Sequence, residues 1–368
     1  MKNTKFDNLP ELFQKGTEKA GWENSRRKEI FKLFQNEVYG IIPKEDELKI
    51  YFRLAYESQG SSIMGGNAKR KTLEITAERK GITMSFPVIM FVPLKPKKKV
   101  GAFITICNRG LKDADPARSF ISPFWPAESI IARGYATAAI LTQDIAPDYF
   151  EGYTMGLHKL FPEYKTNRPD NCFGAITAWA WGASRVLDYM CLDDDIDETK
   201  VAVVGHSRGG KTALWATARD PRFLMGVSSS SGCTGAALSR GKEGEHIVDI
   251  NTRFPYWFCG NYKKYNQRES ELPIDQHMLL ALIAPRPVYV SSKTFDTWAD
   301  PESEFTSCVK ANPVYKLYNL KGMETEKMPL PDQPLMKGQI GYHNMTGYHD
   351  MTQYDWERYL DFADLKLK

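Results

Sequence analysis

Residues 200–215 read KVAVVGHSRGGKTALW, and this stretch decides the fold. The apolar run Val201 to Val204 is typical of a buried strand, and it leads directly into GHSRG and then into a helix-forming run. A G-x-S-x-G sequence between a strand and a helix is the pattern of the nucleophile elbow, a sharp turn that lifts a serine oxygen above the edge of a sheet. We therefore predict that Ser207 is a nucleophile. The alternative is an ordinary serine in a glycine-rich turn, because three fixed positions also recur by chance.

The segments around this stretch predict a mainly parallel sheet with helices on both faces. Strand-like runs at 48–57, 70–80 and 86–93 predict an antiparallel lead-in, and from residue 100 onward strands alternate with helices. Further strands are predicted at 102–107, 136–141, 201–204, 224–230, 287–292 and 314–320, and helices at 22–40, 174–191 and in the C-terminal tail. The tail should bury Trp356, Tyr359, Leu360 and Ala363.

This order of elements predicts that residues 1–368 form a single domain with an α/β-hydrolase fold, which is a three-layer αβα sandwich. Residues 1–47 are expected to form a helical entry segment. The segment 142–173 is too long and too polar for a simple connection, so we expect it to be an insertion that shapes the binding cleft.

Composition excludes several classes of protein. The 368 residues carry a formal net charge of +4 without a basic stripe between aromatic residues, so nucleic acid is not an expected partner. No apolar run reaches about 18 residues, and the N-terminus lacks the apolar core of a signal peptide, so we expect no membrane span and either an internal protein or one whose leader was removed. The 6 cysteines lack metal-ligand spacing, which predicts free thiols, no metal and no cofactor. We expect a monomer.

A serine nucleophile needs a base, and the base needs an acid that orients it. In this architecture the acid follows a late strand and the histidine lies beyond the last one. His349 occupies that place, between the expected strand 314–320 and the closing helix, and Asp296 follows the expected strand 287–292. The sequence therefore predicts Ser207, His349 and Asp296 as a catalytic triad.

Other residues compete for these roles. His343 is expected on the same loop as His349 and is its rival. His277 lies in an apolar helical run and fits a core histidine bonded to a neighbour, and His206 is expected to point away from the site because of the turn. Asp300 and Asp350 are the alternative acids, although each also fits a loop or helix cap.

The strand 102–107 is followed directly by Asn108-Arg109-Gly110. In hydrolases of this architecture the loop after the corresponding strand supplies one backbone N–H to the oxyanion hole. Gly110 fits this role and a plain turn equally well.

Five spaced motifs resemble the bacterial branch of the glucuronoyl esterases, carbohydrate esterase family 15. They cover the chain closely from Gly205 to the C-terminus and are GHSRGGKTALW, SGCTGAALSR, NQRESELPIDQHMLLALIAPRP, DTWADP and GYHDMTQYDWERYLDF. The resemblance implies hydrolysis of the ester that joins a 4-O-methyl-glucuronic acid branch of xylan to a lignin alcohol. It also suggests export, because relatives are commonly exported.

The resemblance implies roles for individual residues. Ser207 would be the nucleophile, His349 the base, and Arg208 would add its guanidinium to the oxyanion donors. Three further residues, Lys211, Glu245 and Trp298, match positions that hydrogen-bond the hydroxyls of the glucuronoyl group. From the residues alone, Arg208 and Lys211 also fit a solvated helix face, and Trp298 also fits core packing.

One position departs from the family pattern. Many members carry a catalytic glutamate where this chain has Ser230. The resemblance then implies that the acid comes from Asp296, which matches a second acid position found in some bacterial members. If Asp296 is misplaced, the enzyme would be weak or altered.

Two other functions remain open from the sequence. The first is another serine esterase of the same fold, such as an acetyl-xylan or cinnamoyl esterase. The second is a carbohydrate-binding protein that has lost catalysis, for which Ser230 is the only indication. A peptidase is disfavoured because no added domain is present to restrict access for peptides.

Overall fold

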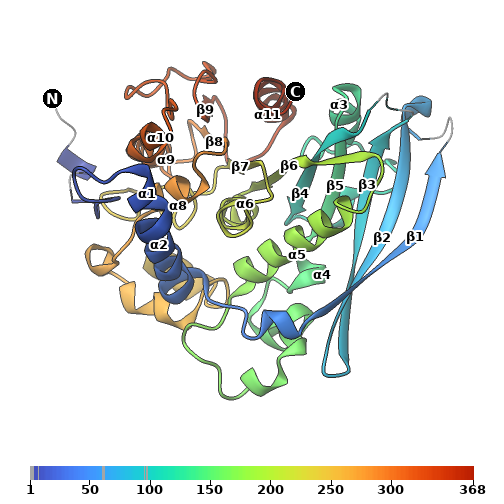
Figure 1. The fold of residues 1–368 in the computed structure, drawn as a ribbon, viewed down its shortest axis with the longest axis horizontal. Coiled ribbons are helices and arrows are strands. Elements are labelled where there is room, and N and C mark those ends of the chain that lie inside the picture. Colours follow the sequence, from blue (N-terminus) through green and yellow to red (C-terminus); the bar gives the residue numbers. More distant parts are fainter. Residues whose placement is uncertain (1–3, 7, 60–62, 95, 97) are drawn as a thin grey trace.

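The computed structural model describes residues 4–6, 8–59, 63–94, 96 and 98–368. Within these residues a nine-stranded sheet forms the centre of the molecule, with the strand order β1-β2-β3-β5-β4-β6-β7-β8-β9 (Figure 1). The strands are β1 (Lys49–Gln59), β2 (Ala68–Arg79), β3 (Ile82–Pro93), β4 (Val100–Cys107), β5 (Ala136–Leu141), β6 (Ile196–His206), β7 (Met225–Ser229), β8 (Val288–Lys293) and β9 (Ile340–Met345).

The sheet has two parts that differ in strand direction. β1, β2 and β3 pair antiparallel with one another, and β3 pairs antiparallel with β5. The six strands β4 to β9 pair parallel. Side chains of β2 alternate between buried and half-buried, as in a strand with one solvated face, whereas every residue of Val201–His206 in β6 is buried.

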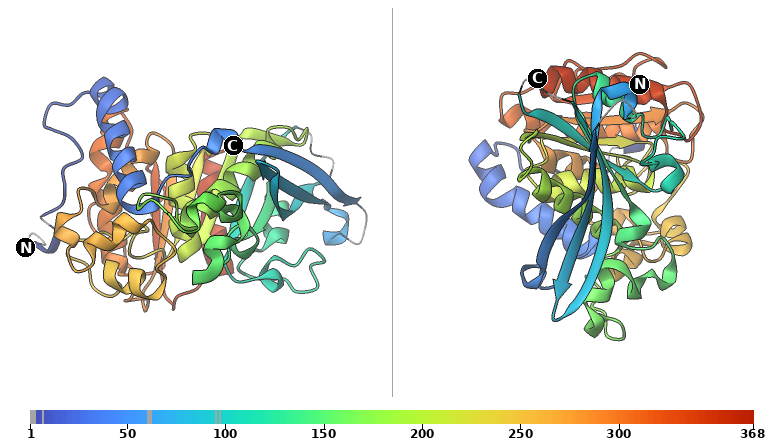
Figure 2. Two further views of the ribbon diagram at one scale, coloured as in Figure 1. Left: turned by 90° about the horizontal axis from the view of Figure 1, so that it is seen from below. Right: turned by 90° about the vertical axis from the view of Figure 1, so that its right-hand side faces the viewer.

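Helices cover both faces of the parallel part, which gives the three layers of an α/β-hydrolase fold. α3 (Ala127–Ala132) and α11 (Gln353–Lys366) contribute to the core on one face, and α2 (Arg27–Phe34), α5 (Ala175–Met190), α6 (Arg208–Arg219) and α8 (Gln276–Ile283) contribute to the core on the other (Figure 2). The predicted inward residues of α11, Trp356, Tyr359, Leu360 and Ala363, are all buried.

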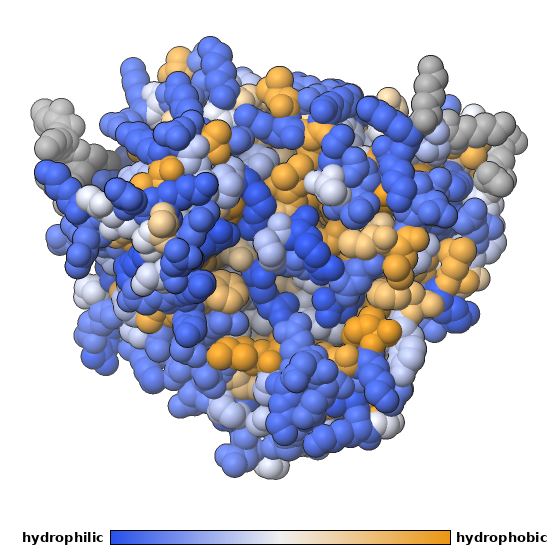
Figure 3. All heavy atoms as spheres, in the orientation of Figure 1, coloured by the Kyte–Doolittle hydropathy of each residue, from blue (hydrophilic) through white to orange (hydrophobic). Residues whose placement is uncertain are grey.

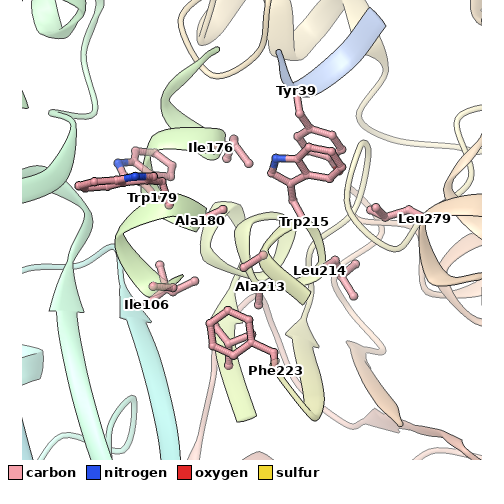
Figure 4. Close-up of a cluster of buried hydrophobic side chains, with 14 of the residues drawn as sticks. Tyr39, Ile106, Ile176, Trp179, Ala180, Ala213, Leu214, Trp215, Phe223 and Leu279 are labelled. Atoms are coloured by element: carbon pink, nitrogen blue, oxygen red, sulfur yellow. The ribbon is translucent and has the colours of Figure 1, made fainter. Parts of the chain in front are cut away.

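The N-terminal segment takes part in the larger core. Residues 19–39 form one continuous helical run through α1 (Lys19–Gly21), α2 and two π-helical turns. Tyr39 at its end stacks on Trp215 of α6 with ring centroids 4.3 Å apart (Figure 4). Trp215 also donates a hydrogen bond from Nε1 to Thr177 of α5, so three segments far apart in sequence hold α6 in place.

The segment 142–173 begins with α4 (Thr142–Ile145) and continues through three 3₁₀ turns, Phe150–Thr154, Gly156–Leu160 and Pro162–Tyr164. The remaining helices are α7 (Ile247–Arg253), α9 (Pro301–Lys310) and α10 (Asn312–Leu317). No helix among the residues described above has the length and apolar character needed to cross a bilayer.

The predicted strand at 314–320 is wrong. These residues begin within α10, and Val314 and Tyr315 are buried against the core. A short apolar run fits a buried helix as well as a strand, and here Pro313 in the first turn favours the helix. The last strand is β9, whose sequence IGYHNM contains few typical strand residues although its first five residues are buried.

Candidate active site

Ser207 lies at the turn between β6 and α6. Its backbone has φ 56° and ψ −123°, a conformation that costs energy for any residue with a side chain. A Cβ at Gly205 would lie 2.0 Å from the carbonyl oxygen of Gly209, so only glycine fits there. The backbone N–H of Ser207 donates to the carbonyl of Ser229 in neighbouring β7 at 2.8 Å. The strained turn is thus held by the sheet itself.

His349 and Asp296 meet on two adjacent loops. Asp296 follows β8, and His349 lies between β9 and α11, so the parallel pairing of β8 with β9 brings the two loops to the same edge of the sheet. His349 Nδ1 lies 2.6 Å from Asp296 Oδ2. The carboxylate is buried while the imidazole is 45% exposed. Because the carboxylate accepts a hydrogen bond from Nδ1–H, Nε2 is left without a proton and can accept one.

His206, which was expected to point away from the site, is buried beside His349. The His206 and His349 rings are 4.5 Å apart at their centroids, and His206 Nδ1 lies 3.2 Å from Ser229 Oγ. Burial, together with the charge on His349, lowers the pKa of His206 far below its usual value. A neutral His206 places no positive charge beside His349.

His343 lies in β9 and not on the loop of His349, so the expectation for this residue is wrong. Its Nε2 lies 2.9 Å from Asp355 Oδ1, and its Nδ1 lies 3.0 Å from the Tyr289 hydroxyl. Asp355 also pairs with Lys293, and the side chains of all three are fully buried. With both ring nitrogens engaged and no exposed surface, His343 has no access to a substrate.

A pocket of about 210 Å³ opens beside Ser207. Six of the seven predicted site residues line it, and the seventh, Asp296, lies directly behind His349. The residues that line this pocket are Ser207, Arg208, Lys211, Ser230, Ser231, Gly232, Glu245, Arg253, Phe254, Trp257, Trp298, Ala299 and His349. Gly110 is not among the described residues that line it, so its role in an oxyanion hole stays a prediction.

Arg208 is the first residue of α6 and lies against the wall of the pocket. Its Nη1 pairs with Asp148, and its guanidinium carbon lies 5.3 Å and 4.8 Å from the ring centroids of Phe254 and Trp257. Its Nε is buried and has no hydrogen-bond partner in the described part of the chain. The guanidinium is therefore not on a solvated helix face, and its Nη2 forms no hydrogen bond within the described residues either.

Lys211, Glu245 and Trp298 lie together on the pocket wall. Lys211 Nζ donates to the carbonyls of Ser231 and Cys233, both at 2.6 Å, and lies 3.5 Å from Glu245 Oε2. The backbone N–H of Glu245 donates to the carbonyl of Trp298 at 3.0 Å. All three N–H donors of Lys211 Nζ thus have partners within the protein. The side chain of Trp298 is 46% exposed and can contact a ligand.

Behind two residues that line the pocket, Ser231 and Gly232, lies a buried carboxyl group that the sequence did not indicate. Glu304 accepts hydrogen bonds from the backbone of Gly232 at 2.9 Å and from Ser292 Oγ at 2.6 Å. Burial raises the pKa of Glu304 to about 7. Ser230 also lies in this region with φ 44°, and its buried Oγ has no partner among the described residues.

The alternative residues have other partners. Asp300 caps α9 by accepting from the backbone of Ser303, and Asp350 pairs with Arg109. His277 bonds the carbonyl of Pro10 at 3.0 Å, as expected for a core histidine. Within the described residues no group of His, Cys, Asp or Glu side chains has the arrangement of a metal site.

Four further residues surround the pocket and are not predicted from the sequence: Asp148, Phe254, Trp257 and Glu304. No motif spacing marks these residues. The only signal for Asp148 was its place in the segment 142–173, which was expected to shape the cleft.

Several known proteins are similar to this chain in sequence or in structure. The family model for fungal glucuronyl esterases matches residues 75–319. A carbohydrate esterase from an unknown prokaryotic organism is 38% identical over 95% of this chain and 86% of its own. The solved structure of a glucuronoyl esterase from Solibacter usitatus has a TM-score of 0.90 and 36% identity, and covers 98% of each chain. A promiscuous esterase of carbohydrate esterase family 15 from a marine bacterial metagenome has a TM-score of 0.88 and 37% identity, over 97% of this chain and 96% of its own. This chain therefore belongs to the glucuronoyl esterase family and is a carboxylic ester hydrolase.

Proposed function

We propose that this enzyme hydrolyses esters of glucuronic acid, with or without a 4-O-methyl group, through an acyl-enzyme on Ser207. The observation that carries the proposal is the shared pocket. It contains a serine on a strained turn, an imidazole bonded to a buried carboxylate, a free guanidinium N–H and a wall that bears Glu245 and Trp298.

The first half of the reaction forms the acyl-enzyme. Ser207 Oγ attacks the ester carbonyl while its proton passes to His349 Nε2, and the carbonyl oxygen becomes an oxyanion. The imidazolium that forms is stabilised by the Asp296 carboxylate at 2.6 Å. When the ester bond breaks, the alcohol leaves with the proton held on Nε2. Water then repeats the same steps on the acyl-enzyme and releases the uronic acid.

Arg208 supplies charge where the transition state needs it. A uronate ester is neutral at the group that is attacked, so negative charge appears only on the developing oxyanion. The unpaired guanidinium N–H groups of Arg208, together with the backbone N–H groups at the start of α6, offer donors that are already oriented. Removal of one such donor typically lowers kcat about 10²- to 10³-fold.

The sugar ring is proposed to bind along Lys211, Glu245 and Trp298. The partly exposed indole of Trp298 offers a flat face and an N–H donor, and Glu245 offers a carboxylate oxygen to a hydroxyl. Lys211 orients Glu245 through their 3.5 Å pair. The natural substrate we propose is an ester between glucuronoxylan and a lignin alcohol, bound by a monomer.

A second candidate, a broader carbohydrate esterase, is favoured by one observation. One of the structural relatives is described as promiscuous. Rates on benzyl glucuronate, methyl glucuronate, acetylated xylan and an aryl acetate separate the two functions. We expect the glucuronates to be hydrolysed with the highest kcat/KM, and a preference for the acetates would contradict the proposal.

The nucleophile is tested separately from the substrate. A labelled phosphonate should modify the wild-type enzyme on Ser207, and mass spectrometry of the digested protein identifies the site. The Ser207→Ala variant should remain unlabelled and lose about 10⁴- to 10⁶-fold in kcat. Labelling elsewhere, or none in the wild type, would support the carbohydrate-binding alternative.

A further inference from the structure

Asp148 holds the guanidinium of Arg208 from outside the helix that carries it. Arg208 begins α6, whereas Asp148 belongs to the segment 142–173, three residues beyond α4. The carboxylate Oδ2 of Asp148 pairs with Arg208 Nη1, and the side chain of Asp148 is only 19% exposed while that of Arg208 is 27% exposed. The contact is thus largely shielded from solvent, where an ion pair is screened least.

The Asp148 carboxylate is itself fixed by two aromatic side chains. Trp257 Nε1 donates to Oδ1 at 2.7 Å, and the Tyr256 hydroxyl lies 3.1 Å from Oδ1 and 2.8 Å from the backbone carbonyl of Asp148. Burial, together with the Asp148 charge, raises the pKa of Tyr256, so this hydroxyl stays protonated and donates. Three separate groups therefore hold the carboxylate in one orientation.

The guanidinium of Arg208 packs beside two stacked aromatic rings. Phe254 and Trp257 stack with centroids 3.8 Å apart and planes 3° from parallel, and the guanidinium lies against both. A flat cation against aromatic faces keeps freedom to turn within its plane. The bond from Nη1 to Asp148 removes that freedom. Nη2 is not buried and forms no hydrogen bond within the described residues, and Arg208 lines the pocket beside Ser207.

We infer that Asp148 is a positioning residue that aims the unpaired N–H groups of the Arg208 guanidinium at the oxyanion. The inference rests on the proposed function only in so far as the reaction passes through an oxyanion. Asp148 offsets part of the cation's charge, but an orientation fixed in advance avoids reorganisation in the transition state, where a misplacement of about 1 Å can cost 10²-fold in rate. Loss of Asp148 should therefore lower kcat, and it should do so only while Arg208 is present.

A double-mutant cycle tests this dependence. We expect Asp148→Ala to lower kcat on benzyl glucuronate about tenfold to a hundredfold, with KM changed less than about twofold. In an Arg208→Ala background the same substitution should cost less than about twofold, because the group it positions is absent. Asp148→Asn keeps one carbonyl oxygen to accept from Trp257 and Tyr256 but presents its NH₂ group to Arg208 Nη1, so it should lower kcat as Asp148→Ala does.

Controls separate positioning from folding. Asp144→Ala removes a half-buried carboxylate of the same segment that does not line the pocket, and it should leave kcat within about twofold. Melting temperatures identify any variant that is unfolded, and Asp148→Asn replaces Asp148→Ala in the cycle if the latter does not fold. Equal losses in both backgrounds, an effect on KM alone, or an unchanged kcat would overturn the inference.

The outcome is distinguishable from failure of the proposed function. If the wild-type enzyme does not hydrolyse glucuronate esters, the proposed substrate is wrong, and the same cycle is then measured on p-nitrophenyl acetate. The coupling between Asp148 and Arg208 should appear on either substrate, because both esters form an oxyanion at the same place.

Discussion

The pair formed by Asp296 and His349 is the residue-scale feature on which catalysis should depend most. Asp296→Asn keeps the side-chain size but removes the charge and allows the wrong imidazole tautomer, so kcat should fall about 10⁴-fold. Steady-state rates on benzyl glucuronate measure this loss. Asp350→Asn is the matched control, since Asp350 is the neighbour of His349 but pairs with Arg109. An unimpaired Asp296→Asn enzyme would show that the acid lies elsewhere.

Glu304 should make the stability of the protein depend on pH. Its pKa of about 7 when folded lies above the usual value near 4.5, so the folded state binds more protons between these values. The contribution of Glu304 to the free energy of unfolding is fully present below pH 4.5. It is lost as pH rises through 7, by about 3 kcal/mol in total. Glu304→Gln removes this loss. The difference in unfolding free energy between variant and wild type should therefore shift in favour of the variant from pH 4.5 to pH 8.

Urea unfolding at several pH values measures this shift. Glu302→Gln, on the exposed side of the same helix, is the matched control and should follow the wild type at every pH. A constant difference between the Glu304→Gln variant and the wild type would show that the carboxyl group ionises normally in the fold.

At the scale of elements, a buried ion pair joins β8, β9 and α11 under the loop that carries His349. Burial alone would raise the pKa of Asp355, but the hydrogen bond from His343 and the charge of Lys293 outweigh it and hold that pKa far below its usual value. Asp355 also closes the first turn of α11 by accepting from the backbone of Thr352 at 2.7 Å. One carboxylate thus supports two strands and a helix start.

Asp355→Asn should destabilise the protein by about 3–5 kcal/mol, because it leaves the Lys293 charge buried without a counter-charge. Chemical unfolding measures the change. Asp361→Asn on the same helix is the control: Asp361 pairs with Arg133 at a site where both side chains are 35% exposed, so its loss should cost at most about 1 kcal/mol. Equal losses in the two variants would contradict the importance of burial.

At the scale of the whole molecule, the fold is stabilised by its core and not by cross-links. All 6 cysteines are free in the structure; Cys191 is exposed and the other five are buried. On the face shown in Figure 3, hydrophobic side chains appear in separate groups among hydrophilic ones, so this face has no broad apolar surface.

We therefore expect one thiol to react quickly with Ellman's reagent in the native protein and 6 to react in urea. A thiol reductant should leave the melting temperature unchanged. A count below 6 in urea without reductant, or a lower melting temperature with it, would indicate a disulfide.

Much of the parallel sheet could be predicted from sequence because its strands are continuous apolar runs. Such runs have few alternatives when they are flanked by turns, and the predicted strand at 224–230 differs from β7 by one residue at each end. The prediction failed at the sheet edge. The run at 314–320 is apolar but helical, and β9 is a strand despite its Gly, His and Asn because β8 offers it a partner.

The sequence by itself determined the nucleophile turn, the order of serine, acid and histidine, and the family, because these depend on local spacing along the chain. Tertiary structure decided which polar groups share a partner. It buried His343 against Asp355, brought His206 beside His349, placed Glu304 under the pocket and set Asp148 against Arg208. These contacts join residues from different elements, and their energies depend on burial and distance, which no spacing in one segment specifies.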